Sequence, residues 1–171
     1  LWANIGDEYF LRETPRDISW HTEALLDRDD PEDPLVLIRE SSQSVLAGGS
    51  QIFIYTPDTR NLFSATVNAL DTLGLTIMDA RIITSADGFS LDTYIVLDEH
   101  GTPIGEDWPR IEQIRKTLTE TLKHPERFSS TVSRRMPRRH KHFDVPTQVL
   151  ISNDIVNDRT AVDIQTLDRP G

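Results

Sequence analysis

From residue 51 onward the chain alternates between short apolar runs and amphipathic stretches. Residues 51–55 form a run rich in strand-forming side chains, and residues 62–73 place apolar side chains at helical spacing. Two further strands are predicted over residues 75–84 and 89–98. The Ser85-Ala86-Asp87-Gly88 segment between them has the composition of a hairpin turn. This half of the chain therefore begins as a strand, a helix and two strands.

A second amphipathic helix is predicted over residues 109–122, and a last strand over residues 147–152. The order from residue 51 is then βαββαβ. This order is typical of an α+β, ferredoxin-like sandwich, in which two helices cover one face of an antiparallel sheet. We expect the first and third of these strands at the centre of the sheet and the 147–152 strand at an edge.

The N-terminal residues 1–26 are predicted to be helical. Thr14-Pro15-Arg16-Asp17 provides a capping residue, a proline at the first helical position and an acid at the third. This short stretch also contains five large apolar side chains, those of Trp2, Tyr9, Phe10, Leu11 and Trp20. We expect these side chains to form an exposed patch that serves a neighbouring domain.

An acidic linker at residues 27–34 contains two prolines, and the apolar run at residues 35–38 suits a buried strand. Near the C-terminus, residues 160–167 alternate between apolar and polar side chains. The loop 153–159 is short enough to fold this segment back as a hairpin. We therefore expect residues 160–167 to be an added strand, paired within the chain or with a second copy through strand edges.

The composition is that of a globular protein, with 37% hydrophobic and 27% charged residues. The chain has no cysteine, which fits the cytoplasm, and no apolar run long enough to span a membrane. A net charge of −10 argues against nucleic acid, whose phosphates are bound by lysine and arginine. The basic run at residues 134–141 is interpreted as a solvated connector.

The sequence offers no catalytic constellation. Asp29-Asp30 lies in the acidic linker and is interpreted as solvated charge. His140 and His142 are flanked by bases that repel a metal ion, and no serine has the G-x-S-x-G surroundings of a nucleophile. We expect this chain to have no catalytic residue, no metal ligand and no cofactor.

Several stretches along the chain have a distinctive order and spacing. They are Leu1-Trp2 to Phe10-Leu11, Trp20-His21-Thr22, residues 52–58, Leu62-Phe63, residues 79–82, Ser152-Asn153-Asp154, and Arg159-Thr160 to Asp168-Arg169-Pro170-Gly171. Together they resemble the C-terminal region of the bacterial bifunctional protein-PII uridylyltransferase/uridylyl-removing enzymes. The basic stretch 134–138 also fits this family.

The resemblance implies a layout of a nucleotidyltransferase domain, an HD hydrolase domain and two ACT domains. Residues 1–34 would follow the HD domain. Residues 35–153 would be the first ACT domain, with a core at 51–153 and a basic linker at 129–146. Residues 154–171 would begin a second ACT domain. Since the chain starts without Met and stops after a strand, we expect it to be a piece of a longer protein.

The activity implied by the resemblance is transfer of UMP from UTP to the PII nitrogen-signalling protein, and its removal when glutamine is abundant. Mg²⁺ is implied for the catalytic domains, and the ACT region would sense glutamine. Its amino-acid ligand would lie where the first strand of each ACT domain turns into a helix. The corresponding candidate ligand-binding residues are Thr56, Asp58, Asn61 and Leu62 in the first turn, and Asp168 and Gly171 in the second.

Asn61 departs from the pattern of the family, which has glycine at that position of the turn. Asparagine tolerates unusual backbone angles, but its side chain can obstruct a ligand. An ordinary strand-to-helix turn without a ligand is an equally good interpretation. An ACT domain that serves only assembly is therefore a second hypothesis.

RNA binding is a third hypothesis, because RNA-recognition domains have the same order of elements. Phe53 and Tyr55 could stack bases from the first strand. Phe89 and Tyr94 are five residues apart and should point to opposite faces, and together with the acidic charge this argues against RNA.

Overall fold

The structure is a computed structural model, and its described residues fall into two compact units, Leu1–Thr131 and Val132–Gly171. Each unit is considered by itself. The described residues are 2–41, 48–127, 146–154 and 159–166.

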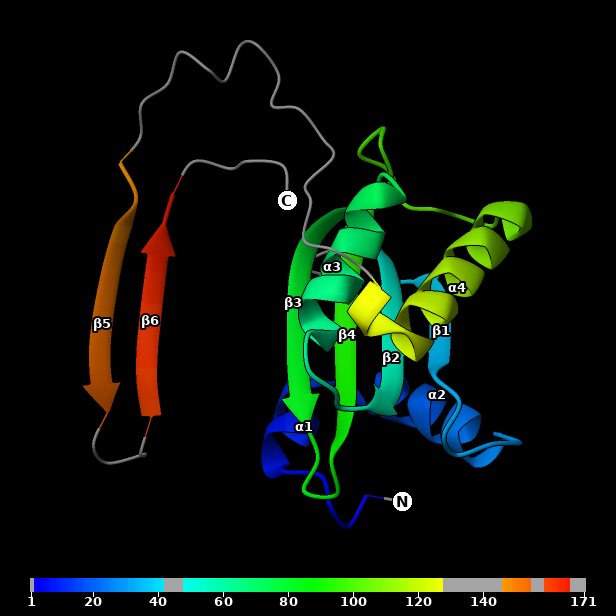
Figure 1. Cartoon of the computed structure of the whole chain (residues 1–171), viewed down its shortest axis with the longest axis horizontal. Coiled ribbons are helices and arrows are strands. Elements are labelled where there is room, and N and C mark those ends of the chain that lie inside the picture. Colours follow the sequence, from blue (N-terminus) through cyan, green and yellow to red (C-terminus); the bar gives the residue numbers. More distant parts are fainter. Residues whose placement is uncertain (1, 42–47, 128–145, 155–158, 167–171) are drawn as a thin grey trace. The chain divides into compact units, whose positions relative to one another are not determined.

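The first unit contains a four-stranded antiparallel sheet of order β1-β2-β4-β3, with α3 and α4 side by side over one face (Figure 1). The predicted α+β, ferredoxin-like class is confirmed, and the strands predicted over 51–55 and 89–98 are the central ones. The elements of the unit are α1 Asp7–Arg12, α2 Pro15–Leu26, β1 Leu35–Glu40, β2 Ser50–Pro57, α3 Leu62–Thr72, β3 Thr76–Thr84, β4 Phe89–Leu97, α4 Trp108–Lys123 and the 3-10 turn η2 Pro125–Arg127.

The strand beside β2 differs from the expectation. The sequence assigned this edge to residues 147–152, whereas β1 pairs antiparallel with β2 from Leu35↔Tyr55 to Glu40↔Ser50. Residues 148–152 lie instead in the strand β5, Gln148–Asp154, in a separate two-stranded sheet. β1 can occupy the edge because its side chains alternate correctly, so that Val36 and Ile38 face the core beneath the helices.

The main core lies between the sheet and the helices α3 and α4. The even-numbered residues of the central strands point into it, so Ile52, Ile54 and Tyr94 are fully buried there. The helices contribute the inward positions that their periodicity predicted. On α4 these are Ile111, Ile114, Leu118, Thr121 and Leu122, all buried.

The opposite face of the sheet is covered by α1 and α2, which corrects the expected exposed patch. Tyr9 is only 1% exposed and packs with Phe53, Ile83 and Leu91. Trp2 and Trp20 are partly buried against the same cluster, while Phe10 stays 40% exposed. Most of the large apolar side chains of the N-terminal segment therefore cover the chain's own sheet. The odd-numbered strand residues make the sheet face opposite α3 and α4 apolar as well.

The position of Phe53 argues against the RNA-binding hypothesis. Its side chain has no exposed surface and lies beneath α1 and α2, so it cannot stack on a base. Tyr55 stacks on Phe89 with ring centroids 4.9 Å apart, and Tyr94 is buried on the other face. The expectation that Phe89 and Tyr94 point to opposite faces is confirmed.

A buried ion pair joins α2 to β1. Thr14 caps α2 through the predicted capping box, and its hydroxyl donates to Oδ2 of Asp17 over 2.6 Å. The other carboxylate oxygen of Asp17 accepts from Nη2 of Arg39. Burial alone would raise the pKa of Asp17, but the hydrogen bonds from Thr14 and the charge of Arg39 hold that pKa below its usual value. The guanidinium carbon of Arg39 lies 3.8 Å from the Trp20 ring centroid, so one arginine holds two positions of α2.

His21 lies in the same layer and has no exposed surface. Its ring stacks on Phe53 with the centroids 3.6 Å apart, and its Nδ1 shares a hydrogen bond of 2.7 Å with the Tyr9 hydroxyl. Nε2 of His21 is buried without a hydrogen-bond partner. Burial lowers the pKa of His21 to about 3, so the ring is neutral at physiological pH.

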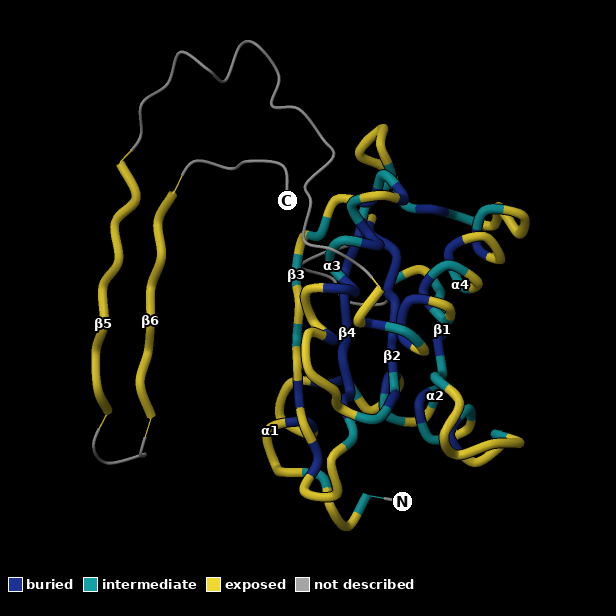
Figure 2. Tube along the Cα trace, in the orientation of Figure 1, coloured by how far each residue is buried: buried dark blue, intermediate teal, exposed yellow. Residues whose placement is uncertain are grey.

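The second unit contains a hairpin of β5 Gln148–Asp154 and β6 Arg159–Gln165, in register from Gln148↔Gln165 to Asp154↔Arg159. The prediction that residues 160–167 form an added strand is confirmed within the described part, by pairing inside the chain. Both faces of the hairpin are exposed (Figure 2). One of them is apolar and carries Val149, Ile151, Val162 and Ile164.

Candidate ligand site

The turn between β2 and α3 is the first candidate site predicted from the sequence. The Asp58 N–H donates to the Gly88 carbonyl over 2.8 Å, which joins the turn to the β3–β4 hairpin. Asn61 has φ +67°, in the left-handed region that asparagine tolerates better than most residues with a side chain. Asn61 is the N-cap residue of α3, but its side chain makes no capping hydrogen bond. The first turn of α3 therefore has no side-chain cap.

We expect Asn61→Ala to lower the free energy of unfolding by about 1 kcal/mol, because alanine is strained in the left-handed region. Asn61→Gly should leave stability unchanged or raise it slightly, since glycine adopts this φ without strain. Urea denaturation of the two variants measures the difference. Equal stabilities of the alanine and glycine variants would contradict the strained geometry.

A cavity of about 310 Å³ lies beside this turn, against the start of α3. Its size is at the lower end of the range for small-ligand sites. The predicted residues Asp58, Asn61 and Leu62 are brought together in its wall. The residues that line it are Asp58, Thr59, Asn61, Leu62, Phe63, Ser64, Ile82, Thr84, Ser90 and Asp92.

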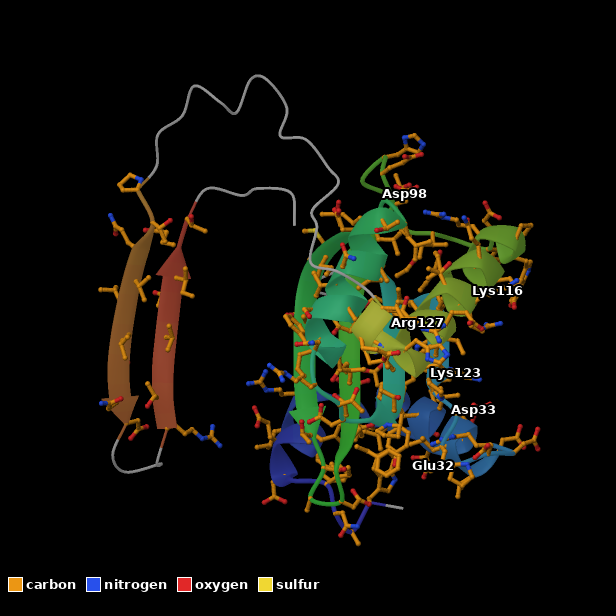
Figure 3. All side chains as sticks on the ribbon, in the orientation of Figure 1. Glu32, Asp33, Asp98, Lys116, Lys123 and Arg127 are labelled. Atoms are coloured by element: carbon orange, nitrogen blue, oxygen red, sulfur yellow. The ribbon has the colours of Figure 1, made fainter. Side chains whose placement is uncertain are left out.

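Thr56 does not join this cavity. It is 2% exposed and borders a second hollow of about 280 Å³ at the end of α4. There Nζ of Lys123 lies 2.9 Å from Oδ1 of Asp33, a pair labelled in Figure 3. Asp168 and Gly171 lie outside the described residues, so the second predicted turn stays a prediction.

Asp92 of β4 is the residue in the cavity wall that the sequence analysis missed. It is 1% exposed, and its Oδ1 accepts a hydrogen bond of 2.5 Å from the Ser90 hydroxyl. Burial, helped by the charge of Asp58, raises the pKa of Asp92 to about 6, although hydrogen bonds from Ser90 and Tyr94 oppose this shift. The available signal was a single charged residue within a strand of uncharged side chains, Phe89–Leu97.

The cavity attracts charges of both signs. The uncapped first turn of α3 presents backbone N–H groups near Phe63 and Ser64 and favours an anion. Asp58 and Asp92 of the same wall favour a cation, and the residues that line the cavity include no lysine, arginine or histidine. A small zwitterion matches this arrangement of charge.

Among the described residues, no group of three or more His, Cys, Asp or Glu side chains could hold a metal ion. None of the described helices combines the length and the apolar character that crossing a bilayer requires.

Comparison with known proteins extends over the whole chain. The model of the family described as "Uridylyltransferase GlnD fifth domain" matches residues 1–24. Proteins called bifunctional uridylyltransferase/uridylyl-removing enzyme are 51% identical in Pseudomonas putida, 49% in Stutzerimonas stutzeri and 48% in Pseudomonas fluorescens. Each of these matches covers 100% of this chain and 19% of the relative.

The chain thus spans about a fifth of the length of these relatives. No solved structure matches it. The resemblance predicted from the sequence is confirmed, because the chain is 51% identical to a relative over all 171 residues. This match extends far beyond the 24 residues that the family model covers. Over its whole length, this chain is similar to one segment, about a fifth, of the bifunctional uridylyltransferase/uridylyl-removing enzymes.

Proposed function

We propose that this chain is the glutamine-sensing regulatory region of an enzyme that adds UMP to the PII protein and removes it. The similarity to enzymes of that name supports the activity of the whole protein. On this proposal PII and UTP bind elsewhere, to nucleotidyltransferase and HD domains, where Mg²⁺ would act. The chain itself would not catalyse. The absence of cysteine from the sequence is compatible with the cytoplasm as its compartment.

The observation that carries the sensing role is the cavity with charges of both signs. The α-carboxylate of glutamine would accept hydrogen bonds from the uncapped N–H groups of α3. Its ammonium would lie near the carboxylates of Asp58 and Asp92. The hydroxyls of Thr84 and Ser90, in the same wall, can exchange hydrogen bonds with the side-chain amide.

Isothermal titration of the 171-residue chain with L-glutamine tests this function, because all the residues of the cavity lie in the first unit. We expect saturable binding that Asp58→Asn weakens about tenfold, the loss of one charge-assisted hydrogen bond. Asp29→Asn makes the same change of charge in the exposed acidic linker and should bind like the parent chain. No heat of binding for the parent chain, or equal affinities in the three proteins, would contradict the proposal.

Assembly without a ligand is the second candidate function, and one observation favours it. β3 is an edge strand, and its side chains Met78 and Ile82 are 52% and 42% exposed. Phe63, which lines the same cavity as Ile82, is 51% exposed. Edge strands with apolar side chains pair readily with a second copy. Sedimentation that shows a dimer, together with no response to glutamine, would favour assembly over sensing.

A further inference from the structure

We propose that Asp92 recognises the ammonium group of the amino-acid ligand, and that it releases a proton to solvent when the ligand binds. This inference rests on the proposed function, and it makes sensing by this cavity dependent on pH. Asp92 is assigned this role from its position in the cavity wall and from the charges around it.

The surroundings of Asp92 give its carboxylate hydrogen bonds but no countercharge. The Ser90 hydroxyl donates to Oδ1 over 2.5 Å, and the Tyr94 hydroxyl lies 3.5 Å from Oδ2. The titratable groups that face Asp92 are Tyr94 on its own strand and Asp58 on the β2–α3 turn. The parts of α3 and β3 that line the cavity add no charge, since they contribute Leu62, Phe63, Ser64, Ile82 and Thr84.

A buried carboxylate without a cation holds its proton more tightly than one in water, and this agrees with a pKa of about 6 for Asp92. An ammonium group in the cavity supplies the missing positive charge. The O–H bond of the acid then breaks, its electron pair stays on the carboxylate, and the proton passes to solvent. The product is an ammonium–carboxylate pair in which the Asp92 side chain is buried, so that the pair is stronger than one between two exposed groups.

Asp58 is less suited to this role. It is exposed to solvent, and the Thr84 hydroxyl lies 3.4 Å from its Oδ2. Water screens the charge of the Asp58 carboxylate. Asp58 therefore attracts the ammonium group, but its own ionisation does not depend on the ligand. Asp92 is 1% exposed, and its ionisation is therefore the step that ligand binding changes.

Linkage gives the sign of the effect. Below pH 6 Asp92 must lose a proton before it pairs with the ammonium, so affinity falls as the pH decreases. Above pH 6 the carboxylate is already ionised, and affinity becomes constant. We expect the dissociation constant for L-glutamine to be about tenfold higher at pH 5 than at pH 7, from one proton linked to binding.

The experiment is calorimetric titration of the 171-residue chain at pH 5, 6 and 7, in buffers of different ionisation enthalpy so that released protons are counted. L-glutamine should release close to one proton at pH 5 and few at pH 7. Glutaramate, which lacks the α-ammonium, should bind more weakly and release none. This comparison needs no variant and is independent of any effect of mutation on folding.

Two matched variants identify the residue. Asp92→Asn keeps the size and the hydrogen-bond acceptor of the side chain, and should remove both the pH dependence and the proton release. Asp58→Asn should bind more weakly at every pH but keep both. Circular dichroism confirms that each variant is folded.

The outcomes separate this inference from the proposed function. If L-glutamine binds equally well at all three pH values, or if the proton release persists in Asp92→Asn, the role of Asp92 is overturned while glutamine sensing stands. If the parent chain binds no glutamine at any pH, both are overturned.

Discussion

Replacement of Asp17 by alanine is expected to lower the free energy of unfolding by about 3–5 kcal/mol, because it leaves the guanidinium of Arg39 without its partner. Asp17 has no exposed surface and accepts hydrogen bonds from both Thr14 and Arg39. The substitution removes the side-chain half of the capping box of α2 and one of the two contacts that Arg39 makes with α2, the other being with Trp20. Chemical denaturation followed by tryptophan fluorescence measures the loss.

A matched control is available on the neighbouring helix. Glu8 and Arg12 of α1 form an i,i+4 pair of 2.8 Å whose side chains are about half exposed. Glu8→Ala should cost about 0.5 kcal/mol or less, as exposed pairs do. Asp17→Ala combined with Arg39→Met should be more stable than Asp17→Ala alone, since the unpaired charge is removed. Similar losses for Glu8→Ala and Asp17→Ala would mean that burial does not set the strength of the pair.

The second large effect is acid destabilisation through His21. Burial lowers the pKa of this histidine from 6.5 to about 3 in the folded chain. The unfolded chain therefore binds a proton first, and the stability linked to His21 is present above pH 6.5 and lost as the pH falls towards 3. At about 1.4 kcal/mol per pH unit, the loss is on the order of 4 kcal/mol over this window.

Asp92 acts in the opposite direction. Its folded pKa is raised, so its contribution is complete below pH 3.8 and is lost as the pH rises through about 6. The two effects are separated by comparing variants. His21→Phe keeps an aromatic ring against Phe53 and should be destabilised much less than the parent chain between pH 6 and pH 4.

His100→Phe changes the same residue type on an exposed loop and should follow the parent curve. Parallel pH profiles for the parent chain and His21→Phe would rule out His21 as the source of the acid lability.

The sequence predicted the elements well, because their signals are local. The capping box at Thr14, the helical spacing of residues 62–73 and the hairpin turn at residues 85–88 each depend on a few neighbouring side chains. The edge of the sheet was predicted wrongly for the opposite reason. Residues 35–40 and 147–152 each contain a short apolar run, and the local pattern does not specify which of the two pairs with β2.

The site was predicted in part. The strand-to-helix turn pointed to Asp58, Asn61 and Leu62, which do line one cavity. Thr56 was misplaced because strand alternation buries it away from that cavity. Asp92 was missed because its role depends on the approach of α3 and β3 from elsewhere in the chain.

The hairpin of β5 and β6 shares a pattern of cross-strand pairs with the hairpin of β1 and β2. In each, two adjacent cross-strand pairs on one face are aliphatic. These pairs are Val36↔Ile54 and Ile38↔Ile52 in the first hairpin, and Val149↔Ile164 and Ile151↔Val162 in the second. On the opposite face, Phe53 of β2 corresponds to Asp163 of β6. α1 and α2 therefore pack on an apolar face around Phe53. A helix packed on the corresponding face of the second hairpin would bury the carboxylate of Asp163, so that face suits contact with water or with a basic side chain.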